Sequence, residues 1–249
     1  MHAPELSVDE AIERAVALAR AGRRSVLGIA GAPGAGKSTL ARRVVAAVDA
    51  ELGVGTAVQV PMDGFHLANA ALDALGRRDR KGAIDTFDAD GYVALVRRLA
   101  AAPDTDGGAV DPDTDGGAAA PDTDGGAAAP DTHGGAAAGG TVVWAPDFDR
   151  RIDEPVAGSI AVPATARLVV SEGNYLLDET EPWAALRDLF AETWFCAVDD
   201  AVRVDRLVGR HMRHGRDHDA ARAWALEVDG VNAARIAPTA SRASRTVRT

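Results

Sequence analysis

The 249-residue sequence has very little cysteine and no long apolar run. Cys196 is its single cysteine, so no disulfide can form within the chain. The N-terminus lacks a basic start followed by an apolar stretch, and nowhere do about eighteen consecutive apolar residues occur, the length that a bilayer span needs. We therefore expect a cytoplasmic protein without a membrane-spanning segment.

The negative charge is concentrated in one segment. The net charge is −10, but residues 103–140 hold eight of the 37 acidic residues and no Lys, Arg or Glu. Without this segment the chain keeps 29 acidic and 27 basic residues, so it is nearly neutral. Because the remainder has no strongly basic stretch, we expect no nucleic-acid partner.

The same segment is a nine-residue repeat of DTDGGAAAP, and it lacks large apolar side chains. The units start at Asp104, Asp113, Asp122 and Asp131. Calcium-binding β-rolls also repeat every nine residues, but each of their turns needs a large apolar residue. The Gly-Gly pairs add backbone freedom that folding would have to remove. We therefore predict a disordered surface loop at 103–140 that interrupts one domain spanning residues 1–249.

Outside the repeat, short apolar runs alternate with helical patterns, which predicts an α/β fold with a parallel sheet. Ser7 and Glu10 form a capping box before the first helix. The tail after Pro238 is expected to be a ragged end or a short edge strand. The expected helices are 8–22, 37–51, 90–102, 183–191, 201–214 and 220–229, and the expected strands are 26–30, 56–60, 141–144, 167–171 and 193–198.

Residues 31–38, GAPGAGKS, match the phosphate-binding pattern G-x-x-x-x-G-K-[ST], between an apolar strand and a helical run. Such a loop turns its N–H groups toward phosphates at a helix N-terminus, so it is more than a glycine-rich turn. Lys37 should reach the β- and γ-phosphates of ATP, and the Ser38 hydroxyl should bind Mg²⁺. Only Lys37 and Lys81 are lysines among 27 basic residues, which indicates sites that need a compact ammonium. The predicted nucleotide-binding residues are Gly31, Ala32, Gly34, Ala35, Gly36, Lys37, Ser38 and Thr39.

Two carboxylates follow predicted strands. Asp63, in PMDGFH, could accept the proton of an attacking hydroxyl or hold a Mg²⁺-bound water, whereas the alternative is a plain Asp-Gly turn. Glu172, in SEGNYLL, is a candidate for the metal or the substrate, whereas the alternative is a helix-capping partner. A GTPase would carry an NKxD-type base-reading motif, which this sequence lacks. The predicted metal ligands are Ser38, Asp63 and Glu172.

Four arginines, Arg203, Arg206, Arg210 and Arg213, are spaced three and four residues apart and so share one stripe of a predicted helix. The stripe could close over a transferring phosphoryl group and exclude water, or it could be a solvated face. Arg206 and Arg210 are the predicted catalytic arginines, together with Lys37 and Asp63. The histidines have neither cysteine nor a close His/Glu pair at ligand spacing, so we expect no zinc site.

The motifs together resemble the uridine kinase, pantothenate kinase and phosphoribulokinase group of P-loop kinases, and within it a nucleoside/nucleotide-kinase-like branch with members assigned as fructose or sugar kinases. The resemblance covers residues 26–235 apart from the repeat. It implies a three-layer α/β/α fold with a five-stranded parallel core, a helical lid and MgATP as donor. The segments that carry it are GAPGAGKST, VPMDGFHL, RKGAIDTFDADG, PDFDRRIDEPV, SEGNYLL and RLVGRHMRHGRD.

The resemblance also implies an acceptor pocket lined by the RKGAIDTFD and PDFDRR segments. The predicted substrate-binding residues are Asp63, His66, Lys81, Asp85, Arg150 and Glu172. We expect an enzyme that phosphorylates a hydroxyl of a sugar, a nucleoside or a pantothenate-like alcohol. The alternatives are an ATP-binding regulatory or chaperone-like ATPase without an acceptor, and an inactive interaction protein. The sequence leaves open whether the protein is a monomer or a homodimer.

We predict that replacing residues 103–140 with a short Gly-Ser linker leaves the melting temperature and the activity nearly unchanged, because the repeat offers no apolar surface for packing and long loops cost little closure entropy. Thermal unfolding and turnover of the shortened chain test this. A large loss of either would mean that the segment packs on the domain or shapes the acceptor site.

Overall fold

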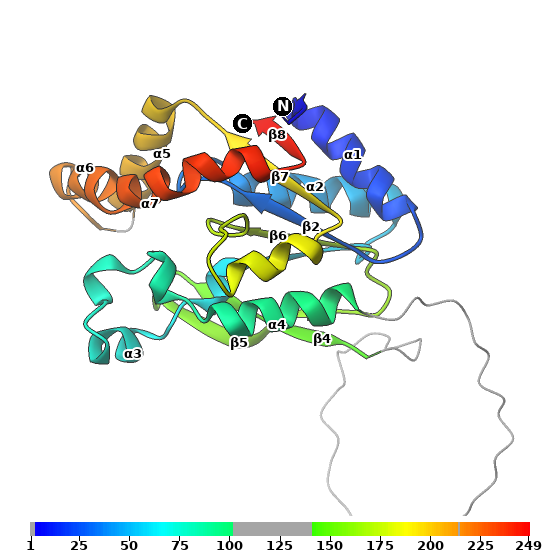
Figure 1. Cartoon of the computed structure of the whole chain (residues 1–249), viewed down its shortest axis with the longest axis horizontal. Coiled ribbons are helices and arrows are strands. Elements are labelled where there is room, and N and C mark those ends of the chain that lie inside the picture. The colour runs from blue at the N-terminus through cyan, green and yellow to red at the C-terminus, as the bar shows by residue number, and fades with distance from the viewer. Residues whose placement is uncertain (1–2, 102–140, 214) are drawn as a thin grey trace, which may run out of the picture.

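The computed structural model describes residues 3–101, 141–213 and 215–249, so the predicted loop of repeats lies outside the described residues. The described residues form a parallel sheet of six strands in the order β1-β8-β7-β2-β6-β3 (Figure 1). Its strands are β1 (Glu5–Leu6), β2 (Ser25–Ala30), β3 (Ala57–Pro61), β6 (Leu168–Gly173), β7 (Glu192–Ala197) and β8 (Arg245–Arg248).

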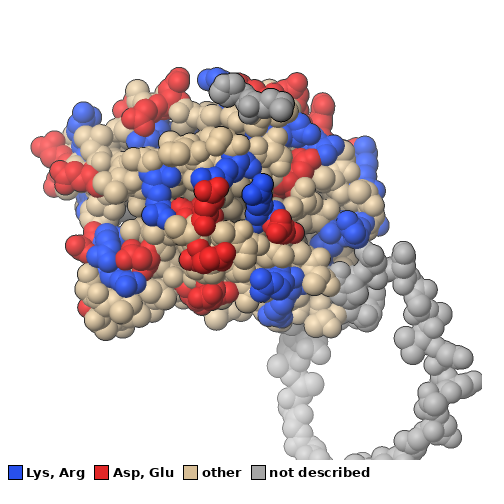
Figure 2. All heavy atoms as spheres, in the orientation of Figure 1, with Lys and Arg blue, Asp and Glu red and all other residues tan. Residues whose placement is uncertain are grey.

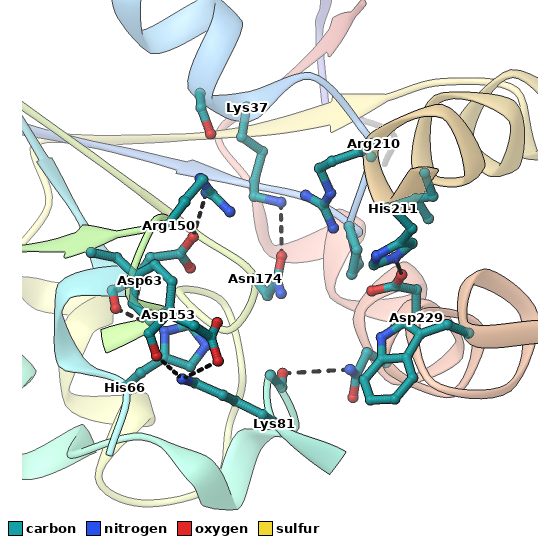
Figure 3. A pocket seen from close by; sticks show the side chains of 18 of the residues that line it. Lys37, Asp63, His66, Lys81, Arg150, Asp153, Asn174, Arg210, His211 and Asp229 are labelled. Carbon is teal, nitrogen blue, oxygen red and sulfur yellow. Dashed lines mark hydrogen bonds and ion pairs between the residues drawn. The ribbon is translucent and has the colours of Figure 1, made fainter. Parts of the chain in front are cut away.

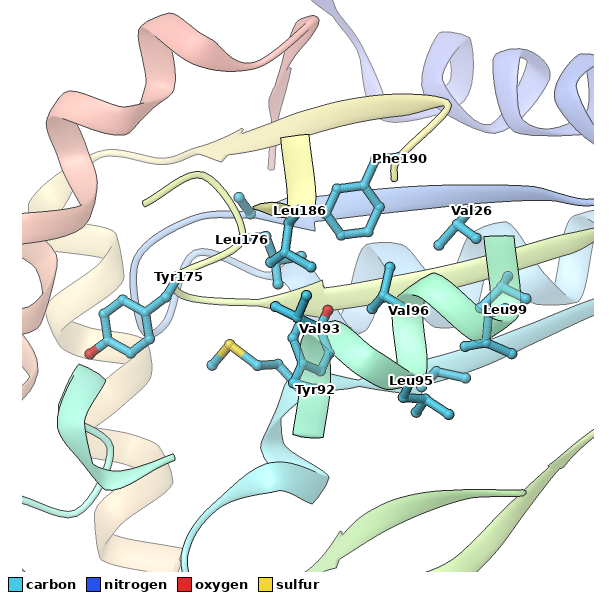
Figure 4. Packing of buried hydrophobic residues seen from close by; sticks show 14 of the residues in the cluster. Val26, Tyr92, Val93, Leu95, Val96, Leu99, Tyr175, Leu176, Leu186 and Phe190 are labelled. Atoms are coloured by element: carbon cyan, nitrogen blue, oxygen red, sulfur yellow. The ribbon is translucent and has the colours of Figure 1, made fainter. Parts of the chain in front are cut away.

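Helices cover both faces of the sheet, as expected for the three-layer fold. Successive side chains of β2 alternate between two cores. Leu27 and Ile29 pack against α1 (Val8–Arg20) and α2 (Lys37–Leu52). Val26 faces the opposite core, which α4 (Ala89–Ala100) and the 3₁₀ helix η4 (Trp183–Asp188) cover. In that core Tyr92, Val93, Leu95, Val96 and Leu99 of α4 lie against the sheet (Figure 4).

The local signals at the start of the chain are confirmed. Ser7 caps α1, its side chain accepts a hydrogen bond from the Glu10 N–H, and the Glu10 carboxylate accepts one from the Ser7 N–H. The bounds of α1, β2 and α2 lie within a few residues of those predicted. No helix in the described ranges is long and apolar enough to cross a membrane.

Several elements differ from the expectation. The tail forms β8 between β7 and β1 inside the sheet, so it is neither ragged nor an edge strand. Four of the expected strands lie in the sheet, and β8 and the short β1 bring it to six strands, one more than the five-stranded core that the resemblance implies. The segment 183–191 forms a 3₁₀ helix in place of an α-helix. The expected short strand at 141–144 extends to Asp149 as β4 (Val143–Asp149), which pairs in an antiparallel hairpin with β5 (Glu154–Val162).

A helical lid follows β7. It consists of α5 (Asp200–Arg213), α6 (His218–Glu227) and α7 (Asp229–Ile236), and the sequence predicted α5 and α6 but not α7. The first two helices share a small core made of Val204, Leu207, Val208, Ala221 and Ala225. In Figure 1 the lid lies to one side of the sheet, above α3 (Asn69–Ala74).

Parallel pairing gathers the motifs at one edge of the sheet. In the strand register Ala30 pairs with Gly173, and Pro61 pairs with Glu172. The glycine-rich loop begins directly after Ala30, and Asp63 stands two residues after Pro61. The phosphate loop, Asp63 and Glu172 therefore meet at the carboxyl ends of three neighbouring strands, where ligands bind in open α/β sheets.

The β4–β5 hairpin packs against the 3₁₀ helix η1 (Met62–Phe65), which carries Asp63. A Cβ at Gly64 would lie 2.4 Å from the Pro146 carbonyl oxygen, so the close approach requires glycine at this position.

We predict that Gly64→Ala separates the hairpin from η1 and destabilises the protein by about 1–3 kcal/mol, the usual cost of overpacking. Urea unfolding measures this, with Gly209→Ala as a control. The added Cβ at Gly209 on α5 meets only ordinary contacts, and alanine favours a helix. Equal stability of the Gly64→Ala and wild-type proteins would contradict the packing argument.

Candidate active site

A cavity of about 1390 Å³ lies at the carboxyl edge of the sheet. Its walls come from the glycine-rich loop, η1, the β4–β5 hairpin, the end of β6 and the three lid helices (Figure 3). Among the sequence-predicted site residues, those that line it are Gly34, Gly36, Lys37, Ser38, Thr39, Asp63, His66, Lys81, Arg150, Glu172, Arg206 and Arg210. Gly31, Ala32, Ala35 and Asp85 are not part of the lining.

The glycine-rich loop ends at Gly36, whose left-handed φ of 89° turns the chain into α2. No side chain caps this helix and no acidic residue occupies its first turn. The first N–H groups of α2 are therefore free for an anion, which the helix dipole also favours. Close packing requires glycine at two further positions of the loop. A Cβ at Gly31 would lie 3.0 Å from the Cys196 carbonyl oxygen, and a Cβ at Gly34 would lie 2.9 Å from the Arg203 carbonyl oxygen.

Lys37 is buried, and protein oxygens satisfy all three of its ammonium protons. Nζ donates to the carbonyl oxygens of Gly31 at 2.9 Å and Ala32 at 3.0 Å, and to Oδ1 of Asn174 at 2.7 Å. Burial lowers the pKa of Lys37, and the nearby Glu172 carboxylate acts against this shift. The two main-chain contacts hold the ammonium over its own loop, while the Asn174 contact comes from the end of β6.

The two predicted carboxylates differ in their surroundings. Burial acts to raise the pKa of Asp63, but His66 when protonated, Arg150 and Lys37 outweigh it and hold the pKa below its usual value. Arg150 donates to Oδ2 of Asp63 at 3.2 Å. Burial raises the pKa of Glu172, and the neighbouring Asp63 adds to this rise. Such a pair, with its pKa values pushed apart, is common in active sites.

Next to Asp63, the ring of His66 is held in one tautomer. Its Nδ1 lies 2.8 Å from the main-chain oxygen of Asp63, which can only accept, so Nδ1 carries the proton. Burial lowers the pKa of His66 and so favours the neutral ring. The ring centroids of Phe87 and Phe148 lie 4.1 and 4.9 Å away. Nε2 of His66 is therefore a hydrogen-bond acceptor.

Lys81, a predicted substrate-binding residue, lines the cavity, and protein oxygens hold its ammonium. Nζ donates to Oδ1 of Asn69 at 2.7 Å and to both the carbonyl oxygen and Oδ2 of Asp153, at 2.5 and 3.1 Å. Asp153 has a left-handed φ of 55° in the turn of the β4–β5 hairpin. In this arrangement Lys81 fastens the RKG segment to the hairpin. Asp85 lies outside the cavity lining, where its carboxylate accepts from Arg80 at 2.8 Å.

The lid places three of its four striped arginines in the cavity: Arg206, Arg210 and Arg213. A Cβ at Gly36 would lie 3.6 Å from Nη1 of Arg206, so this guanidinium stands beside the phosphate loop. Burial lowers the pKa of Arg210, which still leaves the guanidinium charged. Arg203 is buried and pairs with Asp200 on its own helix. Across the face in Figure 2, Lys and Arg are interspersed with Asp and Glu, without a continuous basic band.

Sequence reasoning missed several polar residues of the cavity. Asn174 stood inside the quoted motif SEGNYLL, and its position two residues after Glu172 was the available signal. Asp229 and Asn232 belong to α7, which was not predicted, so no sequence signal pointed to them. His211 was noted only in weighing a zinc site, and it bonds Oδ2 of Asp229 at 2.7 Å.

The donor set fits a magnesium ion shared with a phosphate chain. Ser38, Asp63 and Glu172 offer hard oxygen ligands on one wall of the cavity. Among the described residues, no group of three or more His, Cys, Asp or Glu could hold a metal. Mg²⁺ commonly takes one or two carboxylates and completes its shell with phosphate oxygens and water.

Comparisons with known proteins agree with this site. The "Putative uridine kinase" of Schizosaccharomyces pombe is 30% identical over 218 residues, which cover 86% of this chain and 77% of that protein. The "ATP-dependent kinase-like protein notR'" of Aspergillus versicolor is 32% identical over 183 residues, covering 69% and 84%. The crystal structure of a "putative fructose transport system kinase" from Silicibacter sp. TM1040 superposes with a TM-score of 0.72 at 31% identity, covering 97% of this chain and 98% of that one.

One family model matches a part of the chain. It describes the methylmalonyl Co-A mutase-associated GTPase MeaB, and it covers residues 6–60, the segment around the glycine-rich loop. The similarities to the putative uridine kinase and to the putative fructose transport system kinase extend much further, over 86% and 97% of this chain. The chain therefore belongs to the uridine kinase-like family of P-loop kinases.

Proposed function

We propose that this protein transfers the γ-phosphoryl group of MgATP to a hydroxyl group of a small metabolite. The observation that carries the proposal is the meeting of Lys37, Asp63, Glu172 and the lid arginines on one cavity. Phosphoryl transfer needs little covalent chemistry from the protein, so positioning and charge neutralisation are the main requirements. The cavity offers both, together with a carboxylate that can accept a proton.

In this proposal the free N–H groups of the first turn of α2 and the Lys37 ammonium bind the β- and γ-phosphates, and the ammonium exchanges its contact with Asn174 for a phosphate oxygen. Ser38, Asp63 and Glu172 face the position of Mg²⁺, which when bound neutralises charge on the phosphates. Arg206 and Arg210 approach the same phosphates from the lid and exclude water. Asp63 accepts the proton of the acceptor hydroxyl, and Arg150 keeps its carboxylate oriented.

A regulatory ATPase without an acceptor would need the phosphate-binding half of the cavity alone. The part formed by His66, Phe148, Arg150 and the RKG segment would then have no use, although the hairpin and Lys81 hold it in place. This built acceptor side supports a kinase. A GTPase is favoured by the partial match to the MeaB model, but the chain lacks an NKxD motif.

The test is a measurement of ATP consumption with sugars, nucleosides and pantothenate, and with no acceptor. We expect phosphorylation of at least one of these compounds at a rate well above the background. The Lys37→Ala variant is the matched control, because it removes the ammonium and should abolish transfer without unfolding the domain. Acceptor-independent hydrolysis as the only activity would favour the ATPase, and full activity of Lys37→Ala would exclude the site.

We predict that Asn174→Asp weakens the binding of a non-hydrolysable MgATP analogue by about tenfold. A carboxylate at this position would hold the Lys37 ammonium more strongly and repel the triphosphate. Isothermal titration calorimetry measures the affinity. Asn174→Ala is the control, because it frees Lys37 without adding charge and should bind at least as tightly as the wild type. Unchanged affinity of Asn174→Asp would contradict this role of Asn174.

We also predict that Asp63→Asn lowers kcat by about 10²–10⁴, the usual worth of general-base catalysis, with little change in nucleotide affinity. Asparagine keeps the size of the side chain and its tolerance of a turn, so a purely structural aspartate would be replaced at little cost. Asp90→Asn, on the exposed start of α4, is the control. A decrease in kcat of less than about fivefold with saturating acceptor would rule out the general base.

A further inference from the structure

The lid contributes a polar cluster that the proposed transfer step does not use. Asp229 and Asn232 stand three residues apart on α7, so they share one face of the helix. That face continues through Ala233 and Ile236, which are buried in the manner of an ordinary apolar stripe. Asp229 and Asn232 thus occupy core positions, yet both line the cavity, with 7% and 8% of their surface exposed.

Two side-chain oxygens of this cluster have no hydrogen-bond partner among the described residues, although both residues are largely buried. Oδ2 of Asp229 pairs with Nε2 of His211 at 2.7 Å. Nδ2 of Asn232 makes a long contact of 3.4 Å with the Gly82 carbonyl oxygen. Within the described ranges, neither Oδ1 of Asp229 nor Oδ1 of Asn232 receives a hydrogen bond. Both residues therefore present free acceptor oxygens at the cavity wall, and such oxygens bind ligands that donate hydrogen bonds.

The cluster lies across the cavity from the proposed general base. In Figure 3 His211 and Asp229 stand on one side, Asp63 and His66 on the other, and Asn174 between them. Each side carries an acceptor, because the proposed general base Asp63 is a carboxylate. A ligand between the two sides would need donors at both ends.

The chemistry of this wall discriminates among acceptors. A carboxylate or phosphate of a ligand offers only acceptor oxygens, so it could not hydrogen-bond to the free Oδ1 atoms of Asp229 and Asn232. A nucleobase would be expected to stack on an aromatic ring, but here Arg216 covers Trp224 at 4.0 Å and Lys81 covers Phe148 at 4.9 Å. Neutral hydroxyl groups suit the free oxygens, since each can donate to Asp229 or Asn232.

We propose that Asp229 and Asn232 form the remote half of the acceptor site and bind hydroxyl groups distant from the reacting one, so that the acceptor is a neutral polyhydroxylated compound of the sugar or sugar-alcohol class. The proposal rests on the kinase function proposed above. It selects the sugar class over nucleosides and over pantothenate-like acids.

The experiment measures binding, so that it does not depend on turnover. The wild-type protein, saturated with a non-hydrolysable MgATP analogue, is titrated by calorimetry with D-fructose, D-ribose, sorbitol, uridine and pantothenate. We expect the tightest binding from one of the three neutral polyols. Asn232→Leu and Asp229→Asn should each weaken that binding by about tenfold or more, the worth of a hydrogen bond to a buried polar group. Asn232→Leu removes no charge, so it should leave the nucleotide affinity unchanged.

Val231→Ala is the matched control, because Val231 lies on the exposed face of the same helix, with 68% of its surface accessible. If Asn232→Leu fails to fold, the more conservative Asp229→Asn provides the test. Three results would each overturn the proposal. They are tighter binding of uridine or pantothenate than of the polyols, binding of none of the polyols, and polyol binding that both variants leave unchanged. Polyol binding that the variants weaken, without phosphoryl transfer to any compound, would sustain the subsite and refute the kinase.

Discussion

The parallel pairing of β2, β6 and β3 is the constraint on which the site depends. Each strand runs in the same direction, so three loops that are far apart in the sequence emerge at one edge. The sheet is buried on both faces, and a shift in register by one residue would exchange the two cores that β2 separates. Apolar packing on both faces of the sheet therefore fixes the positions of Lys37, Asp63 and Glu172 relative to one another.

Charge balance within the cavity is the second constraint. The Lys37 ammonium, the Asp63 and Glu172 carboxylates and the Arg210 guanidinium are held close together with limited access to water. Each charge is tolerated because an opposite one lies nearby, and the removal of one would leave its neighbour uncompensated. The hairpin supplies Arg150 as the partner of Asp63, and the lid supplies Asp229 as the partner of Arg210. These two elements therefore help to balance the charges in the cavity as well as enclosing it.

Much of this arrangement could be predicted from local patterns. Some signals are contained in a few adjacent residues: the capping box at Ser7, the phosphate loop, and the carboxylates that follow two strands. They were enough to predict the fold and the central residues of the site. The β4–β5 hairpin and β8 depend on pairing between distant segments, which single-sequence patterns do not specify. Asn232 was out of reach because it lies at an apolar-stripe position of a helix with a weak pattern, and its role depends on what α7 faces. Lys81 was singled out by composition, but only the structure shows the Asp153 oxygens that bind it.

The two ends of the β4–β5 hairpin lie in different surroundings. Val143 pairs with Val162 at the end of the hairpin away from its turn. The turn carries Arg150 and Asp153 into the cavity. The seven residues of β4 separate this turn from the Val143 end by about 20 Å, at the usual rise of a strand. The Val143 end of the hairpin therefore lies well away from the cavity. A fluorescent label attached at Val143 would therefore move with the hairpin without reaching the residues that line the cavity.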